Sequence, residues 1–291
     1  MDIANFLEQH ALPEHYAREA EQWFYPVAEQ IYTQQQQLNK AMVLGINGSQ
    51  GSGKSTLAAL FVLLFKQIYQ LNAVSISIDD FYFTLAEREQ LAQHVHPLMA
   101  TRGVPGTHDI DLANKTLRQL LAGTSEVLIP RFNKALDNRY AQDQWAAVNK
   151  PVDIIILEGW CLGAEAQSAI DLKQPINALE ANEDADCLWR EYVNQQLDVL
   201  YPCLFQHVDQ WLMLQAPSFD CVYQWRLEQE HKLRDRYVRQ GLSRQTKIMQ
   251  DAEVKRFISF YQRITENLLV MLPAQVDYLF KLDEQRRVRG F

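Results

Sequence analysis

Residues 48–55 read Gly-Ser-Gln-Gly-Ser-Gly-Lys-Ser and match the pattern G-x-x-x-x-G-K-[ST] in full. Glycines in such a loop let backbone N–H groups turn inward around a polyphosphate. A helix that begins near Lys54 adds its positive end, Lys54 adds a charge, and the Ser55 hydroxyl is a ligand for Mg²⁺. The pattern predicts a nucleotide-binding loop formed by Gly48, Ser49, Gln50, Gly51, Ser52, Gly53, Lys54, Ser55 and Thr56.

The sequence around this loop alternates between short apolar runs and helical patterns. The run at 42–47 precedes the loop, and an apolar, helix-forming stretch follows it at 56–69. Further strands are predicted at 73–78, 152–157, 208–214 and 276–282, with helices at 187–201, 219–240 and 254–272. Strands separated by helices favour a parallel sheet with right-handed crossovers. The expected fold is a three-layer α/β/α P-loop NTPase with a mostly parallel central sheet.

The same reading divides the chain unevenly. Residues 1–40 are polar and helical, and we expect a helical N-terminal extension packed on the core. Residues 41–291 are expected to form a single P-loop kinase-like domain. Within it, 83–150 mixes short helical pieces with Gly, Pro, His and Arg and is interpreted as acceptor-binding insertions, and about 226–250 as a helical lid.

Composition limits the partners. The chain has 28 Lys+Arg against 36 Asp+Glu, a formal charge of −8, which argues against a dedicated nucleic-acid binder. Its four cysteines show no C-x-x-C spacing, no apolar run approaches the ~18 residues that span a bilayer, and residues 1–6 lack a signal-peptide layout. We expect a cytoplasmic protein, monomer or homodimer, without nucleic-acid or membrane partners.

Three acids follow predicted strands. Glu158 ends the run at 152–158, and Asp79 and Asp80 follow the run at 73–78. Ligands of open parallel sheets gather at the carboxyl ends of the strands, where Glu158 could orient Mg²⁺. Adjacent acids on an extended segment point to opposite sides, so one of Asp79 and Asp80 should face the phosphates and accept a hydroxyl proton.

Three classes of P-loop protein are candidates: small-molecule kinases, GTPases, and motor or transport ATPases. A GTPase needs N-K-x-D late in the chain, but Asn133-Lys134-Ala135-Leu136 ends in leucine and precedes Glu158, and no S-G-G-Q signature of a transporter occurs. A kinase needs cations to cover the transferring phosphate. Residues 226–256 carry nine Lys/Arg against five Asp/Glu, and among them Arg234 and Arg239 are candidates for lid cations.

Longer strings carry a resemblance. The sequences ATRGVPGTHDIDL (100–112), LIPRFNKALDNR (128–139) and VDIIILEGWCLGA (152–164), with Trp189, Arg190, Val193 and Asn194, resemble the D-glycerate 3-kinase family of plants and its fungal and bacterial relatives. That family is a branch of the uridine kinase, phosphoribulokinase and pantothenate kinase superfamily. The resemblance runs from about residue 40 to 285.

The resemblance implies roles for individual residues. The acid that acts as base or metal ligand maps to Asp79 rather than Asp80, and 102–109 lies where relatives bind the phosphate acceptor. Catalytic roles fall to Lys54, Asp79, Glu158, Arg234 and Arg239, and Mg²⁺ ligation to Ser55, Asp79 and Glu158. Acceptor-binding candidates, beside Asp79, are cations suited to a carboxylate and side chains suited to a hydroxyl: Tyr82, Arg102, His108, Arg131 and Lys134.

The resemblance implies MgATP-dependent phosphorylation of a hydroxyl on a small anionic metabolite, with D-glycerate as the leading acceptor. Two alternatives stay open. The acceptor could be a nucleoside, pantothenate or another sugar acid. The chain could also be a nucleotide-binding regulatory protein that has lost transfer activity.

Overall fold

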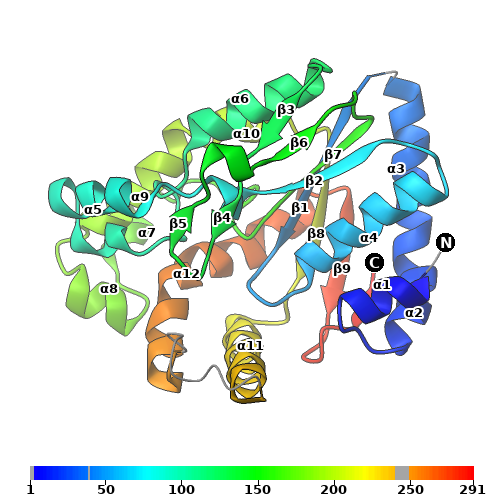
Figure 1. Ribbon diagram of the computed structural model, residues 1–291. Helices are drawn as coiled ribbons and strands as arrows, with labels where there is room; N and C mark the ends of the chain where they lie inside the picture. The colour runs from blue at the N-terminus through cyan, green and yellow to red at the C-terminus, as the bar shows by residue number, and fades with distance from the viewer. Residues whose placement is uncertain (1–2, 39, 240–248) are drawn as a thin grey trace.

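The computed structural model describes residues 3–38, 40–239 and 249–291, without the side chains of 236–239. Its centre is a six-stranded sheet in the order β10-β9-β8-β1-β7-β2 (Figure 1). All neighbouring pairs are parallel except β10 with β9. The strands are β1 (Met42–Gly48), β2 (Ala73–Ser77), β7 (Ile154–Gly159), β8 (Gln210–Gln215), β9 (Tyr278–Leu282) and β10 (Val288–Gly290).

The middle of the sheet is apolar on both faces. Every residue of β1 and of β7 is buried, which is typical of a parallel strand covered by helices on both sides. Helix α4 (Lys54–Gln67) contacts β1, β2 and β7 on one face. On the other face α12 (Asp251–Met271) runs along β8, where Gln215 Nε2 donates to Leu269 O at 3.1 Å. No helix in the described part of the chain is long and apolar enough to cross a bilayer.

The N-terminal residues are helical. The segment contains α1 (Ile3–Gln9), α2 (His15–Glu19), one π-helical turn (Ala20–Phe24) and α3 (Tyr25–Leu38), which packs beside α4 (Figure 1). Phe24 is buried with its ring edge-on to Phe280 of β9, 5.1 Å between ring centroids. The segment therefore shares the hydrophobic core of the sheet.

The insertion at 83–150 is more regular than the sequence suggested. It holds α5 (Leu85–His94), α6 (Ile110–Leu121) and two small antiparallel sheets, β3 (Val127–Ile129) with β6 (Ala146–Val148) and β4 (Phe132–Asn133) with β5 (Asn138–Arg139). Its centre is Arg88, which is fully buried and donates to the carbonyls of Phe83, Ala100 and Asp137 at 3.2, 2.6 and 2.7 Å.

All five predicted strands are present, shifted by up to two residues at either end. Strand β10 and the four short strands of the insertion were not predicted. One local expectation was wrong. Asp79 and Asp80 lie in a 3₁₀ turn (Ile78–Phe81), not on an extended segment. The predicted helix at 187–201 is confirmed as α9 (Leu188–Val199), and the short helix α10 (Pro202–Phe205), which begins at a proline, follows it.

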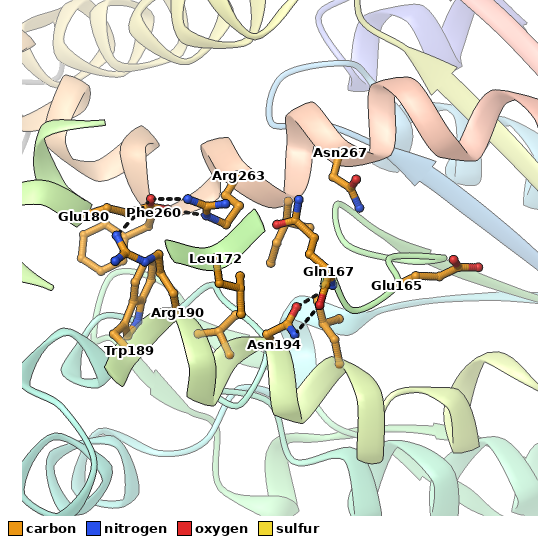
Figure 2. A pocket seen from close by; sticks show the side chains of 13 residues that line it. Glu165, Gln167, Leu172, Glu180, Trp189, Arg190, Asn194, Phe260, Arg263 and Asn267 are labelled. Carbon is orange, nitrogen blue, oxygen red and sulfur yellow. Dashed lines mark hydrogen bonds and ion pairs between the residues drawn. The ribbon is translucent and has the colours of Figure 1, made fainter. Parts of the chain in front are cut away.

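A buried charge cluster joins three helices that follow the central strands (Figure 2). Glu180 of α8 (Ala178–Glu183) accepts hydrogen bonds from Arg190 of α9 at 3.3 Å and from Arg263 of α12 at 2.7 and 2.8 Å. Asn194, one turn beyond Arg190, accepts from the Gln167 N–H at 2.7 Å and donates to its carbonyl at 3.0 Å. The motif residues Arg190 and Asn194 thus hold α9 to its neighbours.

The cavity inside this cluster is small. Its volume of about 20 Å³ has room for a water molecule and not for a metabolite. Glu180 and Arg190 are almost completely buried, and the side chain of Arg263 is 11% exposed. The cluster is therefore part of the scaffold that fixes α12 against the sheet.

Replacing Glu180 with Ala is expected to lower the free energy of unfolding by about 3–5 kcal/mol, because Arg263 loses its carboxylate partner and Arg190 loses one of its two. Glu183 of the same helix is a matched control, since its pair with Arg256 is 38% and 51% exposed and should contribute at most about 1 kcal/mol. Urea unfolding measures both variants. Equal losses for Glu180→Ala and Glu183→Ala would contradict this role of the cluster.

Candidate active site

The carboxyl ends of three adjacent strands bring the candidate residues together. In the sheet register Glu158 of β7 lies beside Ile46 of β1 and beside Ser77 of β2. The glycine-rich loop leaves β1 two residues after Ile46, and Asp79 follows Ser77 by two residues. The loop, Glu158 and Asp79 therefore meet at one edge of the sheet, where open α/β sheets bind ligands.

The loop has the backbone that its glycines predict. It connects β1 to α4, which begins at Lys54. Gly51 and Gly53 have φ of +81° and +95°, in the left-handed region that favours glycine. A Cβ on Gly51 would also lie 2.8 Å from the Cβ of Trp225. The predicted loop residues, Gly48 to Thr56, thus form one continuous turn into the positive end of α4.

The oxygen atoms around Ser55 suit a hard divalent cation. Ser55 Oγ donates to Glu158 Oε1 at 2.7 Å, and Lys54 Nζ lies 3.8 Å from Glu158 Oε2. Within the described residues, Glu158 Oε2 and the hydroxyls of Ser49 and Ser52 are buried without a hydrogen-bond partner. Mg²⁺ binds through one or two protein oxygens together with phosphate oxygens. Ser55 and Glu158 fit that role, and no described group of three His, Cys, Asp or Glu side chains forms a metal site by itself.

Asp79 is the acid that faces the loop. Its Oδ1 accepts a hydrogen bond from Tyr82 Oη at 2.8 Å, and its Oδ2 pairs with Lys134 Nζ at 2.8 Å. Burial alone would raise the pKa of Asp79, but the charges of Lys134 and Lys54 and these hydrogen bonds outweigh it and hold the pKa well below its usual range. Asp79 is therefore a carboxylate at neutral pH.

Asp80 faces the other way. Its Oδ2 pairs with Arg131 Nη1 at 2.6 Å, and its Oδ1 accepts from the Phe132 N–H at 3.1 Å. Burial raises the pKa of Asp80, because it outweighs the opposing effect of Arg131. The two acids thus face different partners, as predicted, although both lie in a 3₁₀ turn and not on an extended segment.

A cavity of about 240 Å³ lies between the loop and Asp79. Four of its lining residues are cations and one is an acid, Asp79. The cations come from the loop, the 83–150 insertion and α11 (Phe219–Arg239): Lys54, Arg102, Lys134 and Arg226. Its remaining walls are Gln50, Gly51, Ser55, Tyr82, Trp160, Gln229, Phe257 and Tyr261. Arg102 and Arg226 pair with Asp137 and Glu230, which lie outside the lining, so the cavity surface itself presents more cations than acids, which suits anionic ligands.

Some predicted residues lie outside this lining. His108 is buried behind Tyr82, 4.5 Å between ring centroids, with Nδ1 2.6 Å from Tyr201 Oη. Burial lowers the pKa of His108 to about 4, so it is neutral. Arg131 is engaged with Asp80, and Arg234 donates to Met249 O at 3.1 Å. The side chain of Arg239 and residues 240–248, the rest of the predicted lid, lie outside the described residues.

Other lining residues were not among the predicted site residues. Arg226 stands above the Phe257 ring, 5.4 Å from its centroid, and its Nε is buried without a partner among the described residues. Arg226 belongs to the basic stretch at 226–256. The sequence does not show which arginine of that stretch reaches the cavity, because this depends on the packing of α11 against α12. Phe257 and Tyr261 on α12 have the spacing of an ordinary core stripe, so their sequence gives no functional signal.

Comparison with known proteins agrees with this geometry. Residues 43–173 match the Phosphoribulokinase / Uridine kinase family. The chain is 36% identical over 233 residues to an uncharacterized kinase, mug58, of Schizosaccharomyces pombe, covering 76% of this chain and 79% of that one. It is 31% identical to the chloroplastic D-glycerate 3-kinase of Arabidopsis thaliana, over 82% of this chain but only 48% of the plant protein.

Solved structures show the same fold. A D-glycerate 3-kinase of Cryptococcus neoformans superposes with a TM-score of 0.70 at 24% identity, covering 86% of this chain and 89% of the other. The matches in sequence and fold together show that the chain belongs to the phosphoribulokinase/uridine kinase family of P-loop kinases.

Proposed function

We propose that the chain transfers the terminal phosphoryl group of MgATP to a hydroxyl of a small anionic metabolite, with D-glycerate as the leading acceptor. The observation that carries this proposal is the cavity beside the loop, whose single acid, Asp79, stands among four cations. An acceptor that carries a carboxylate fits this excess of cations over acids in the lining. Lys134 and Arg102 lie on the insertion, away from the loop, where they would face the acceptor and not the donor. The likeness to the Arabidopsis enzyme supports the choice of D-glycerate.

Asp79 is placed to orient the acceptor. Both its carboxylate oxygens are engaged, one by Tyr82 and one by Lys134. An acceptor carboxylate that binds Lys134 would draw the ammonium group away and free Oδ2 for the acceptor hydroxyl. Asp79 then accepts the hydroxyl proton as the new O–P bond forms and the bond from the terminal phosphorus to the oxygen of ADP breaks. Tyr82 keeps the carboxylate in position through its hydrogen bond to Oδ1.

The loop side of the cavity serves the phosphoryl donor. Lys54 and Arg226 face the space between the loop and Asp79, where negative charge spreads over the transferring group. Ser55 and Glu158 supply oxygen ligands for the divalent cation. A divalent cation held by Ser55 and Glu158 would neutralise negative charge on the donor phosphates. We propose this role for Arg226 beside the one that the sequence suggested for Arg234 and Arg239.

A nucleoside is the second candidate acceptor. The specific observation in its favour is that, beside Tyr82, three further aromatic side chains, Trp160, Phe257 and Tyr261, line the same cavity. Trp160 and Tyr261 are nevertheless packed edge-on against each other, 4.8 Å between ring centroids and both buried, so neither offers a free face for base stacking. The charge of the lining favours the anionic acceptor.

The proposal is tested by measuring ADP release from MgATP with a panel of acceptors that contains D-glycerate, other sugar acids, pantothenate and uridine. D-Glycerate should stimulate ADP release most, and a phosphorylated acid should accumulate in equal amount. Stimulation by uridine or pantothenate alone would move the acceptor to another class. No stimulation by any acceptor would favour a nucleotide-binding protein without transfer activity.

Replacing Asp79 with Asn should lower kcat by about 10²–10⁴-fold, because an amide cannot accept the hydroxyl proton. Asp80→Asn is the control, since Asp80 faces Arg131 and not the cavity, and its kcat should stay within about tenfold of the parent. Steady-state kinetics at saturating MgATP separates the two. Equal losses would show that the acid facing the cavity is not the proton acceptor.

Lys134→Ala should raise KM for the acceptor by roughly 10–100-fold and leave KM for ATP nearly unchanged, because one charged hydrogen bond to the acceptor is lost. Lys134 is also a main cause of the low pKa of Asp79. Without it that pKa rises, so the acidic limb of kcat/KM should move to higher pH. Lys150→Ala, an exposed lysine at the far end of the insertion, should change neither quantity. A larger effect on KM for ATP would place Lys134 at the donor.

A further inference from the structure

His108 lies behind the cavity beside the loop and is not part of its lining, so it does not touch the acceptor itself. It is joined to the cavity wall through Tyr82. The two residues form a short antiparallel backbone bridge, next to which the Asp109 N–H donates to Phe81 O at 2.7 Å. The backbone therefore holds His108 and Tyr82 side by side.

The side chains of this pair stack on each other. Their ring centroids are 4.5 Å apart, with 23° between the ring planes. The ring of Phe132 meets the same tyrosine edge-on, 5.3 Å between ring centroids. Aromatic pairs favour both arrangements, and together they confine the Tyr82 ring. From this position the Tyr82 hydroxyl donates to Asp79 Oδ1 at 2.8 Å.

The ring of His108 is in turn held by Tyr201, a buried residue that precedes α10. His108 Nδ1 lies 2.6 Å from Tyr201 Oη, and that oxygen also accepts from the Gly106 N–H at 3.2 Å. Since burial lowers the pKa of His108 to about 4, the imidazole is neutral and one of its nitrogens accepts a hydrogen bond. The hydroxyl hydrogen of Tyr201 fits Nδ1 as that acceptor, which assigns the ring hydrogen to Nε2.

Packing alone does not account for an imidazole at this position. Nε2 of His108 is buried and has no hydrogen-bond partner among the described residues. A buried polar group without a partner costs stability. An aliphatic side chain would avoid that cost, but it would offer Tyr82 no flat face and Tyr201 no acceptor. The imidazole supplies both contacts, and they set the direction of the Tyr82 ring.

We propose that His108 is a positioning residue for phosphoryl transfer: it holds the Tyr82 ring so that the Tyr82 hydroxyl keeps the Asp79 carboxylate turned toward the acceptor. The inference rests on the proposed function, in which Asp79 accepts the proton of the acceptor hydroxyl. It gives His108 a role without placing it on the acceptor. It also extends the site from Asp79 through Tyr82 and His108 to Tyr201.

The positioning is tested without any acceptor by NMR of protein labelled with ¹³C at the aspartate Cγ atoms. Asp79→Asn identifies the Asp79 signal, and Tyr82→Phe shows how far it moves when the hydrogen bond is lost. His108→Ala should move the signal in the same direction. In the Tyr82→Phe background, His108→Ala should leave the signal in place. No movement in the parent background, or equal movement in both backgrounds, would overturn the proposal.

His207→Ala is the matched control for this measurement. His207 is also a histidine whose Nε2 is buried without a partner among the described residues, but it lies outside the cavity lining. Its replacement should leave the Asp79 signal unmoved. Thermal unfolding shows whether each variant is folded. If His108→Ala does not fold, Tyr201→Phe takes its place, because it removes only the hydroxyl that holds the His108 ring.

Steady-state kinetics with MgATP and D-glycerate tests the consequence for transfer. His108→Ala should lower kcat by about tenfold, the scale of one aromatic pair, with KM for ATP unchanged. His108→Phe keeps a flat ring against Tyr82 and should recover most of that loss. In the Tyr82→Phe background, His108→Ala should lower kcat no further, whereas a merely structural loss would add to that of Tyr82→Phe.

Additive losses of kcat, or His108→Phe as slow as His108→Ala, would overturn the proposal. The NMR result keeps it separate from the proposed function. A parent chain that phosphorylates no acceptor would contradict the proposed function, and the Asp79 signal would still decide whether His108 positions Tyr82.

Discussion

The site depends on one partly buried carboxylate that stays charged. Burial works against the ionised form of Asp79, and Lys134 and Lys54 reverse that effect. The two lysines come from opposite sides, Lys54 from the start of α4 and Lys134 from the insertion. Asp79 therefore lies between the group that would hold the donor phosphates and the group that would hold the acceptor. Loss of either cation would change both the geometry and the proton affinity of the acid.

Two parts of the fold position this carboxylate and the groups around it. The parallel register of β1, β7 and β2 sets the glycine-rich loop, Glu158 and Asp79 at one edge. The insertion then brings cations over that edge, and the buried guanidinium of Arg88 organises it by binding three backbone carbonyls. The charge cluster of Glu180 keeps α12 in place, and α12 supplies Phe257 and Tyr261 to the cavity wall. The rigid sheet thus positions the loop, and the added segments complete the cavity.

Local signals predicted the parts of the site that have a sequence pattern. The loop, the central strands and the carboxylates that follow them could be found because glycine spacing and apolar runs are local properties. Arg226 and Arg131 show where this fails: both are arginines in basic stretches, but tertiary packing directs one to the cavity and the other to Asp80. The five short or antiparallel strands were missed because two- or three-residue strands carry no periodicity. The stacking of His108 on Tyr82 joins segments that lie apart in the chain, which no local pattern encodes.

The central claim is that Lys134 leaves Asp79 and binds the carboxylate of the acceptor. Four kcat/KM values test it. They are measured for the parent chain and for Lys134→Ala, each with D-glycerate and with glycerol, which lacks the carboxylate. The parent should prefer D-glycerate by roughly 10–100-fold, the range of one charged hydrogen bond, and the preference should nearly vanish in the variant. The same preference in both proteins would contradict the claim, because the carboxylate would then be held by another group.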